Sequence, residues 1–302
     1  MSTLTKFNGL IDNPNLPILT TQGLIDQQIG GFLFRLEEQG YTITQQEINA
    51  ITTFINTIRN HPDYGDMSSY VRAVYPFIGD RNNPSAAKVG IYSDTLFNFS
   101  DSFDSFAFDA NNKIQGITAT PAGALKLGDV AEEKFMDISF VLKKPQTSSQ
   151  SNLDFFRFGS TEQIGYRLND GYGLAIRFRR PDTNIYLRNL ADSMGSKSEA
   201  GIYQYRGGAK NNDTATGQYV RAWKKYGESA GGTSGSGTTS NPFNVLFTEN
   251  DLNLSLNPCS YPNGYSIQCI LVFAKRTTSW TYFLNAIEKL MIDLGRIQTN
   301  NE

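Results

Sequence analysis

From Tyr70 onward, short apolar and aromatic runs recur between turns rich in Gly, Asn, Asp and Pro. In the cleanest run, Phe135 to Lys143, apolar residues occupy every second position, which is the period of a β-strand with one buried face. The succession of such runs predicts a mainly β fold, an antiparallel β-sandwich or jelly roll. We expect strands at Tyr70–Ile78, Phe103–Phe108, Phe135–Lys143, Phe155–Phe158, Gln163–Leu168, Leu174–Arg179, Asn184–Asn189, Gly201–Tyr205, Tyr219–Lys225, Phe243–Phe247 and Tyr265–Lys275.

Two helices are predicted before these strands. Apolar residues from Ile25 to Leu36 recur at helical spacing, and the helix is expected to end near Gly40. The second helix begins with a capping box, Thr44 with Glu47, and stops before His61-Pro62. The apolar stripes of this hairpin need a partner surface, either their own domain, which we favour, or another subunit.

A third helix is predicted after Thr277, with Gly295 at the position of a C′ glycine. These patterns divide the chain into an extended arm and helical hairpin (1–65), a β-sandwich (66–276) and a C-terminal helix packed on the sandwich (277–302). The Gly- and Ser-rich stretch from Gly227 to Asn241 has few side chains to pack, so we expect a mobile surface loop there.

Composition excludes several function classes. The 302 residues carry 27 basic and 29 acidic side chains, a net charge of −2, which argues against nucleic acid as a partner. One histidine and two cysteines cannot form a multi-His or Cys-rich metal site, so no metal or cofactor is expected. The longest apolar run is far shorter than the ~20 residues of a membrane span, so no membrane insertion is expected. Cys259 and Cys269 flank a turn and could face each other, but reduced thiols are favoured.

Carboxylates occur in two arrangements that could support catalysis or calcium binding. Glu249 and Asp251 would share a strand face, as in sandwich-fold glycoside hydrolases, but no second catalytic carboxyl follows them. The acidic turns at Asp101, Asp104 and Asp109 have the oxygen chemistry of a calcium site, although Asp-rich turns are the more common explanation. A Ser-His-Asp triad would have to use His61, but a histidine in a turn after a helix more commonly interacts with the negative end of the helix dipole. We therefore predict no catalytic residues and no enzyme activity.

Two segments are candidates for ligand contact. Asn169, Asp170 and Tyr172 combine an amide, a carboxylate and an aromatic ring, a set that binds sugars, yet the same segment has the composition of a plain hairpin turn. A basic cluster, in which a polyanion contact is conceivable but a solvated strand face is favoured, contains Arg177, Arg179, Arg180 and Arg188 with Tyr186.

The order of parts resembles a group of tailed-bacteriophage structural proteins that carry a concanavalin A-like (laminin-G-like) jelly roll. The resemblance extends over about residues 10 to 295 and rests on an Asn13-Pro14 arm, two helices, a strand with Tyr70-Val71-Arg72-Ala73, many further strands and a closing helix. The most similar motifs are Ile176 to Asn189 with its Arg188-Asn189 pair, Gly201-Ile202-Tyr203 followed by Tyr219-Val220-Arg221, and Leu290 to Gly295 in the closing helix.

The resemblance implies a virion component, either a head decoration or fibre or a tail accessory protein, synthesised in the host cytoplasm. Its implied partners are other virion proteins, copies of itself and a host-surface glycan. The hypothesis we prefer is a non-enzymatic structural protein that displays a lectin-like sandwich and gains strength from many repeated contacts. The alternative is a carbohydrate-binding adhesin or a glycan depolymerase.

Overall fold

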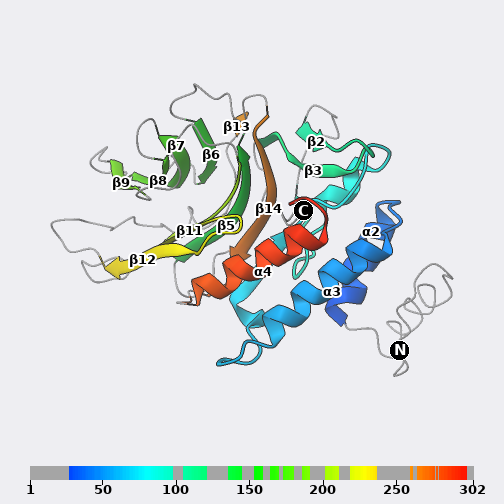
Figure 1. Ribbon diagram of the computed structural model, residues 1–302, viewed down its shortest axis with the longest axis horizontal. Coiled ribbons are helices and arrows are strands. Elements are labelled where there is room, and N and C mark those ends of the chain that lie inside the picture. The colour runs from blue at the N-terminus through cyan, green and yellow to red at the C-terminus, as the bar shows by residue number, and fades with distance from the viewer. Residues whose placement is uncertain are drawn as a thin grey trace.

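The computed structural model describes residues 27–97, 105–120, 135–144, 153–158, 164–169, 173–179, 186–190, 201–210, 218–236, 259–260, 264–275, 277 and 279–297. It is built mainly from antiparallel β-sheet, with a layer of helices on one side (Figure 1). This agrees with the fold class expected from the alternating runs. The finer assignment, a concanavalin A-like jelly roll, stays a prediction.

The two N-terminal helices form as their sequences predict. Helix α2 spans Gln27–Glu38 and α3 spans Gln45–Arg59. The capping box of α3 is present in full, since Thr44 Oγ1 accepts from the Glu47 backbone N–H and the Glu47 carboxylate accepts from the Thr44 backbone N–H. The apolar stripes of both helices lie in one core with β-strand residues, so the hairpin packs on its own chain, as favoured above.

The larger sheet has eight strands. Its main path is β12-β11-β10-β5-β14-β3-β2, and β1 also pairs with β14. The strands are β1 (Val71–Tyr75), β2 (Phe106–Phe108), β3 (Ile114–Ile117), β5 (Phe135–Lys144), β10 (Gly201–Lys210), β11 (Gln218–Lys225), β12 (Gly231–Ser236) and β14 (Ser266–Phe273).

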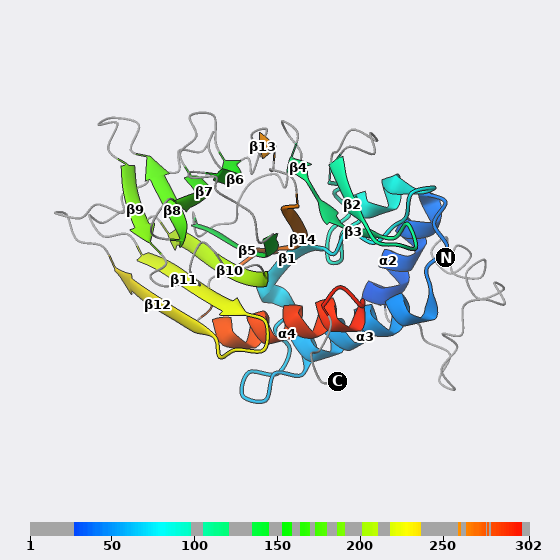
Figure 2. The same cartoon turned by 45° about the horizontal axis from the view of Figure 1, so that its top comes forward.

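A second sheet has four strands in sequence order: β6 (Leu153–Phe158), β7 (Ile164–Asn169), β8 (Gly173–Arg179) and β9 (Tyr186–Leu190). It lies on the side of the larger sheet that faces away from the closing helix (Figures 1 and 2). A short third sheet pairs β4 (Ala119–Thr120) with β13 (Cys259–Ser260). The strand expected at 243–247 lies outside the described residues.

The Gly- and Ser-rich stretch departs from its prediction. Residues 231–236 form β12, an outer strand that pairs with β11 from Gln218 to Trp223. The expectation of a mobile loop was wrong for these residues because strand pairing uses backbone N–H and C=O groups, and an edge strand needs no large side chains.

Strand β14 is the centre of the larger sheet. All eight of its residues are buried. One edge pairs with β5, and the other is shared between β3 at Ile267 and β1 from Ile270 to Phe273. Gly116 of β3 comes so near that an added Cβ would lie 2.5 Å from the carbonyl oxygen of Ile267. That close approach requires glycine.

The closing helix α4 spans Trp280–Asp293 and packs against α3, β10 and β11. It ends in a Schellman motif: Gly295, with φ +71°, donates to the Ile292 carbonyl, and Arg296 donates to the Met291 carbonyl. The predicted C′ glycine is therefore confirmed. The turn brings Arg296 back into the interior, where it is buried.

Candidate functional site

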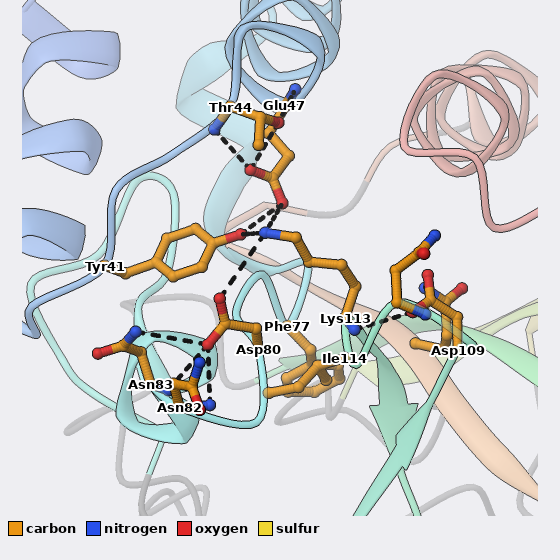
Figure 3. A network of polar contacts seen from close by, with 12 residues as sticks. Tyr41, Thr44, Glu47, Phe77, Asp80, Asn82, Asn83, Asp109, Lys113 and Ile114 are labelled. Carbon is orange, nitrogen blue, oxygen red and sulfur yellow. Dashed lines mark hydrogen bonds and ion pairs between the residues drawn. The ribbon is translucent and has the colours of Figure 1, made fainter. Parts of the chain in front are cut away.

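A polar network around Lys113 joins the helices to the sheet (Figure 3). Lys113 Nζ donates to the Tyr41 hydroxyl at 2.7 Å. The same Nζ lies 3.8 Å from Asp80 Oδ2 and 4.0 Å from Glu47 Oε1. The four residues come from the α2–α3 connection, the first turn of α3, the segment after β1 and the residue before β3. The network therefore joins segments that are far apart in sequence.

Local turn chemistry places each carboxylate of this network. Glu47 Oε2 caps α3, while its Oε1 accepts from the Tyr41 hydroxyl at 2.7 Å. Asp80 Oδ1 accepts from the backbone N–H groups of Asn82 and Asn83 at 3.0 and 2.9 Å. Each carboxylate thus fixes a cap or a turn with one oxygen, and its other oxygen faces the ammonium group of Lys113.

The electrostatics of the network favour structure over catalysis. Burial, reinforced by the neighbouring Glu47 carboxylate, raises the pKa of Tyr41 well above its ordinary value, so the phenol stays protonated at neutral pH. It donates one hydrogen bond and accepts another. The Tyr41 hydroxyl and the Glu47 and Asp80 carboxylates all bond to backbone N–H groups or to other members of the network. We therefore interpret the network as a joint between the helices and the sheet.

Arg296 forms a second joint that the sequence analysis missed. Its Nη1 donates to the carbonyls of Pro76 and Gln268, and its Nη2 donates to those of Phe77 and Ile114. Burial lowers the pKa of Arg296 to about 10, which still leaves the guanidinium charged at neutral pH. The C′ glycine before it marks the end of the helix, but it does not reveal that the next side chain enters the core.

Arg206 and Asp137 form a buried ion pair between β10 and β5. The Arg206 Nε donates to both Asp137 oxygens at 3.0 Å, and the two side chains are 0% and 1% exposed. The Arg206 guanidinium also lies 4.1 Å from the ring centroid of Phe273. Neither residue was singled out in the sequence. The one available clue was Asp137 itself, an acidic residue inside a strand that is otherwise strongly apolar.

The predicted sugar-contact residues meet the described structure only at Asn169. Asn169 is the last residue of β7, and its backbone pairs with Gly173, the first residue of β8. Strands β7 and β8 are therefore antiparallel neighbours, and the plain-turn and sugar-contact interpretations of the residues between them both stay predictions. Asp170 and Tyr172 lie outside the described residues, so their role in ligand contact stays a prediction.

The strand register brings most of the predicted basic cluster together. Arg177 lies opposite Arg188 on the neighbouring strand, and Arg179 lies opposite Tyr186. Arg180 lies outside the described residues. The cluster therefore occupies adjoining positions on two paired strands.

The remaining candidates have structural roles or are not described. His61 Nδ1 accepts from the backbone N–H groups of Asp63 and Tyr64, which confirms that it is a turn histidine. Asp109 Oδ1 accepts from the N–H groups of Asn111 and Lys113, which confirms its turn role. Four acidic candidates lie outside the described residues: Asp101, Asp104, Glu249 and Asp251. In the described part of the chain, no three His, Cys, Asp or Glu residues gather as metal ligands would.

The two cysteines belong to different sheets. Cys259 lies in β13, which pairs with β4, whereas Cys269 lies in the middle of β14 opposite Val141 of β5. They do not face each other across a hairpin, because the strands on either side of their turn pair with other partners. Cys269 is a buried free thiol, and burial raises its pKa to about 12.

Comparisons with known proteins leave the family open. No protein-family model matches the sequence, and no curated protein matches it. Among solved structures, the Ruminococcus gnavus IT-sialidase CBM40 shares 16% identity over 56% of this chain and 96% of its own, with a TM-score of 0.34. A structure described as a receptor binding domain shares 10% identity over 55% of this chain and 36% of its own, with a TM-score of 0.32.

A third similar structure is the catalytic domain of a glycoside hydrolase family 131 protein from Coprinopsis cinerea. It shares 10% identity over 48% of this chain and 58% of its own, with a TM-score of 0.27. All of these TM-scores lie below 0.5, so none of the three assigns a fold family or an activity to this chain. Among the described helices, none has both the length and the apolar character of a membrane span.

Proposed function

We propose that the chain is a non-catalytic structural component of a tailed-phage particle that attaches through one end and displays its sandwich at the other. The proposal starts from the order of elements that resembles the phage proteins. The observation that carries it is the two-ended organisation of the described residues. Helices α2, α3 and α4 lie together at one side of the molecule, and the four-stranded sheet lies at the opposite side (Figure 2).

The helical side has the rigidity that an attachment platform needs. Residues of α2, α3 and α4 share one apolar core with β1 and β14. The polar joints at Lys113 and Arg296 fix the segments beside them. A weak contact made by such a rigid platform becomes strong when many copies are held in a symmetric particle.

A particle reconstruction tests this proposal. Density that fits the described fold in repeated positions on the intact particle is the expected result, and particles assembled without the chain should bind the purified protein. A purified chain that stays monomeric and does not join such particles would contradict the proposal.

Glycan contact through the β7–β8 hairpin is the second candidate function. The observation in its favour is the ladder from Ile164 to Asn169, which pairs to its last residue with Gly173. Only three residues, Asp170 to Tyr172, separate these paired positions in the sequence, so a carboxylate and an aromatic residue follow the Asn169 amide directly.

A binding screen with a matched variant tests the second candidate. On an array of neutral glycans, Tyr172→Ala should abolish binding while the thermal midpoint stays unchanged, because aromatic stacking supplies much of sugar affinity. Tyr64→Ala is the control, since Tyr64 is an exposed tyrosine in a different turn. No binding by the native chain, or equal binding by the Tyr172 variant, would remove the hairpin from consideration.

A further inference from the structure

The register of the four-stranded sheet separates its residues into two unlike faces. Residues directly opposite each other on paired strands share a face, as do residues two apart along a strand. One face carries three rows across the strands that are apolar except for one asparagine. Its positions are Leu153, Leu168 and Leu174; Phe156, Tyr166, Ile176 and Asn189; and Phe158, Ile164, Phe178 and Leu187. This composition is typical of a face that covers a core.

The other face is rich in arginine, and we call it the arginine face. Its central row runs across all four strands as Arg157, Gly165, Arg177 and Arg188. A second row places Asp154 opposite Arg167, and a third places Arg179 opposite Tyr186. In these described strands the arginine face therefore holds five arginines and one aspartate, within a chain whose net charge is −2.

The positions of the arginines on this face do not favour the stability of the sheet. Arg177 and Arg188 are cross-strand partners, and like charges directly opposite each other destabilise a pair of strands. Asp154 is opposite Arg167 and balances that position, but the register gives the central row no acidic partner. A bound anion would remove this repulsion.

The residue types indicate which anion. Every basic position on the face is arginine, whose planar guanidinium binds carboxylates with two parallel hydrogen bonds, whereas lysine is the usual solubilising cation. Gly165, which has no side chain, separates Arg157 from Arg177 in the central row. Neighbouring strands lie about 4.8 Å apart, so these two arginines start from backbone positions about 10 Å apart, with a glycine position between them.

We propose that the arginine face binds an acidic polysaccharide, and that its central row, in which Gly165 stands between Arg157 and Arg177, is where sugar carboxylates bind. Tyr186 and Asn169 belong to the same face by strand parity and add an aromatic ring and an amide, two groups suited to sugar rings and hydroxyls. The low net charge of the chain favours this ligand over nucleic acid, which is held mainly by long-range attraction to many phosphates.

This inference goes beyond both proposed functions, because it concerns a sheet face and a charged ligand. A chain that fails to join particles, or a Tyr172 variant that keeps its binding to neutral glycans, leaves it intact. Conversely, if the arginine face does not bind an acidic polysaccharide, the attachment proposal and the hairpin proposal are unaffected.

Binding of the full chain to polygalacturonate, measured at low and at moderate ionic strength, tests the proposal. Native protein should bind, and added salt should weaken the binding. Arg177→Ala and Arg157→Ala should each weaken it about tenfold or more, the effect of losing one charge-assisted contact. Arg177→Lys should give an intermediate loss because it keeps the charge but not the fork.

One control variant matches the loss of charge. Lys275→Ala removes an exposed cation outside this sheet. It should change the affinity by about twofold or less. Gly165→Val, which adds a side chain at the glycine position of the central row without removing charge, should abolish binding while the circular dichroism spectrum stays native.

Three outcomes would overturn the proposal: no binding to polygalacturonate, equal losses in the central-row and control variants, or tighter binding to single-stranded DNA than to polygalacturonate. The last result would assign the face to nucleic acid. If Gly165→Val does not fold, the comparison of Arg177→Lys with Lys275→Ala still decides the case.

Discussion

The helix–sheet junction and the four-stranded sheet use charged residues in opposite ways. At the junction, Lys113 is surrounded by Tyr41, Glu47 and Asp80, and the Arg296 guanidinium donates to four backbone carbonyls. On the four-stranded sheet, Arg177 and Arg188 occupy facing positions in a row that has no acidic member.

The difference teaches where to look for function in a fold of this kind. Charges that are matched inside the chain lower the energy of the fold and are not free to bind anything else. Like charges at facing positions of paired strands destabilise the pair, so such positions are where we look for a ligand. The five predictions that follow test this contrast, in order of decreasing expected effect.

Arg206→Met should lower the free energy of unfolding by about 4 kcal/mol, because it leaves Asp137 buried without its cation. Urea denaturation measures the effect. The double variant Asp137→Leu/Arg206→Met should recover much of the loss, since it removes both charges. A double variant less stable than the single one would show that the pair stabilises the fold in its own right.

Arg296→Met should cost about 3 kcal/mol, because four backbone carbonyls lose a donor in the interior. One of them belongs to Phe77, whose φ of +50° is rare for a residue other than glycine. Arg81→Met, at an exposed arginine whose guanidinium lies 4.8 Å from the Phe108 ring centroid, is the control and should cost well under 1 kcal/mol. Equal losses in the two variants would contradict the role given to Arg296.

Lys113→Met should cost about 1–2 kcal/mol. The substitution leaves Glu47 and Asp80 facing each other without a cation, but both carboxylates keep their cap and turn hydrogen bonds and are partly hydrated. Thermal unfolding with added salt provides the readout, and the gap between native and variant should narrow as salt screens the charges.

Tyr41→Phe should cost about 1 kcal/mol at neutral pH and should also reduce the sensitivity of the fold to alkali. The pKa of Tyr41 is raised in the folded state, so its contribution is complete below the ordinary tyrosine pKa near 10 and is lost as the pH rises above that value. Unfolding free energies at pH 7 and at about pH 11 test this. An unchanged alkaline slope would show that other buried tyrosines, such as Tyr205, dominate it.

Arg188→Ser should have the smallest effect, leaving stability unchanged or raising it by a few tenths of a kcal/mol. The substitution removes one member of a like-charged cross-strand pair. A calorimetric scan of the variant beside native protein measures it. A loss above about 1 kcal/mol would mean that Arg188 supports the fold, and the contrast between the two regions would then fail.

Sequence reasoning predicted local elements well and long-range contacts poorly. The capping box at Thr44, the C′ glycine at 295 and the alternation in β5 are short-range patterns, and the structure contains all three. The Gly- and Ser-rich strand β12 was missed because its stability comes from the backbone of β11. Joints such as Arg296 were missed because their partners lie up to 220 residues away.

The candidate site shows the same division. Pairing of the strands on either side of residues 170–172 was predictable from Asn, Asp and Gly in sequence, whereas the row from Arg157 through Gly165 to Arg188 was not. It requires the register of three strand pairs, and a shift of one residue in any of them would move an arginine to the opposite face.

The place of β14 in the sheet has a consequence for biosynthesis. Strand β1 is complete at Tyr75, but its partner residues, Ile270 to Phe273, are translated almost 200 residues later. At ~5–20 residues per second, the nascent chain waits roughly 10–40 s for the strand that β1, β3 and β5 share. The larger sheet can therefore close only after residues 266–273 have been translated, and until then the exposed strand edges of each nascent chain are open to pairing with neighbours on the same polysome.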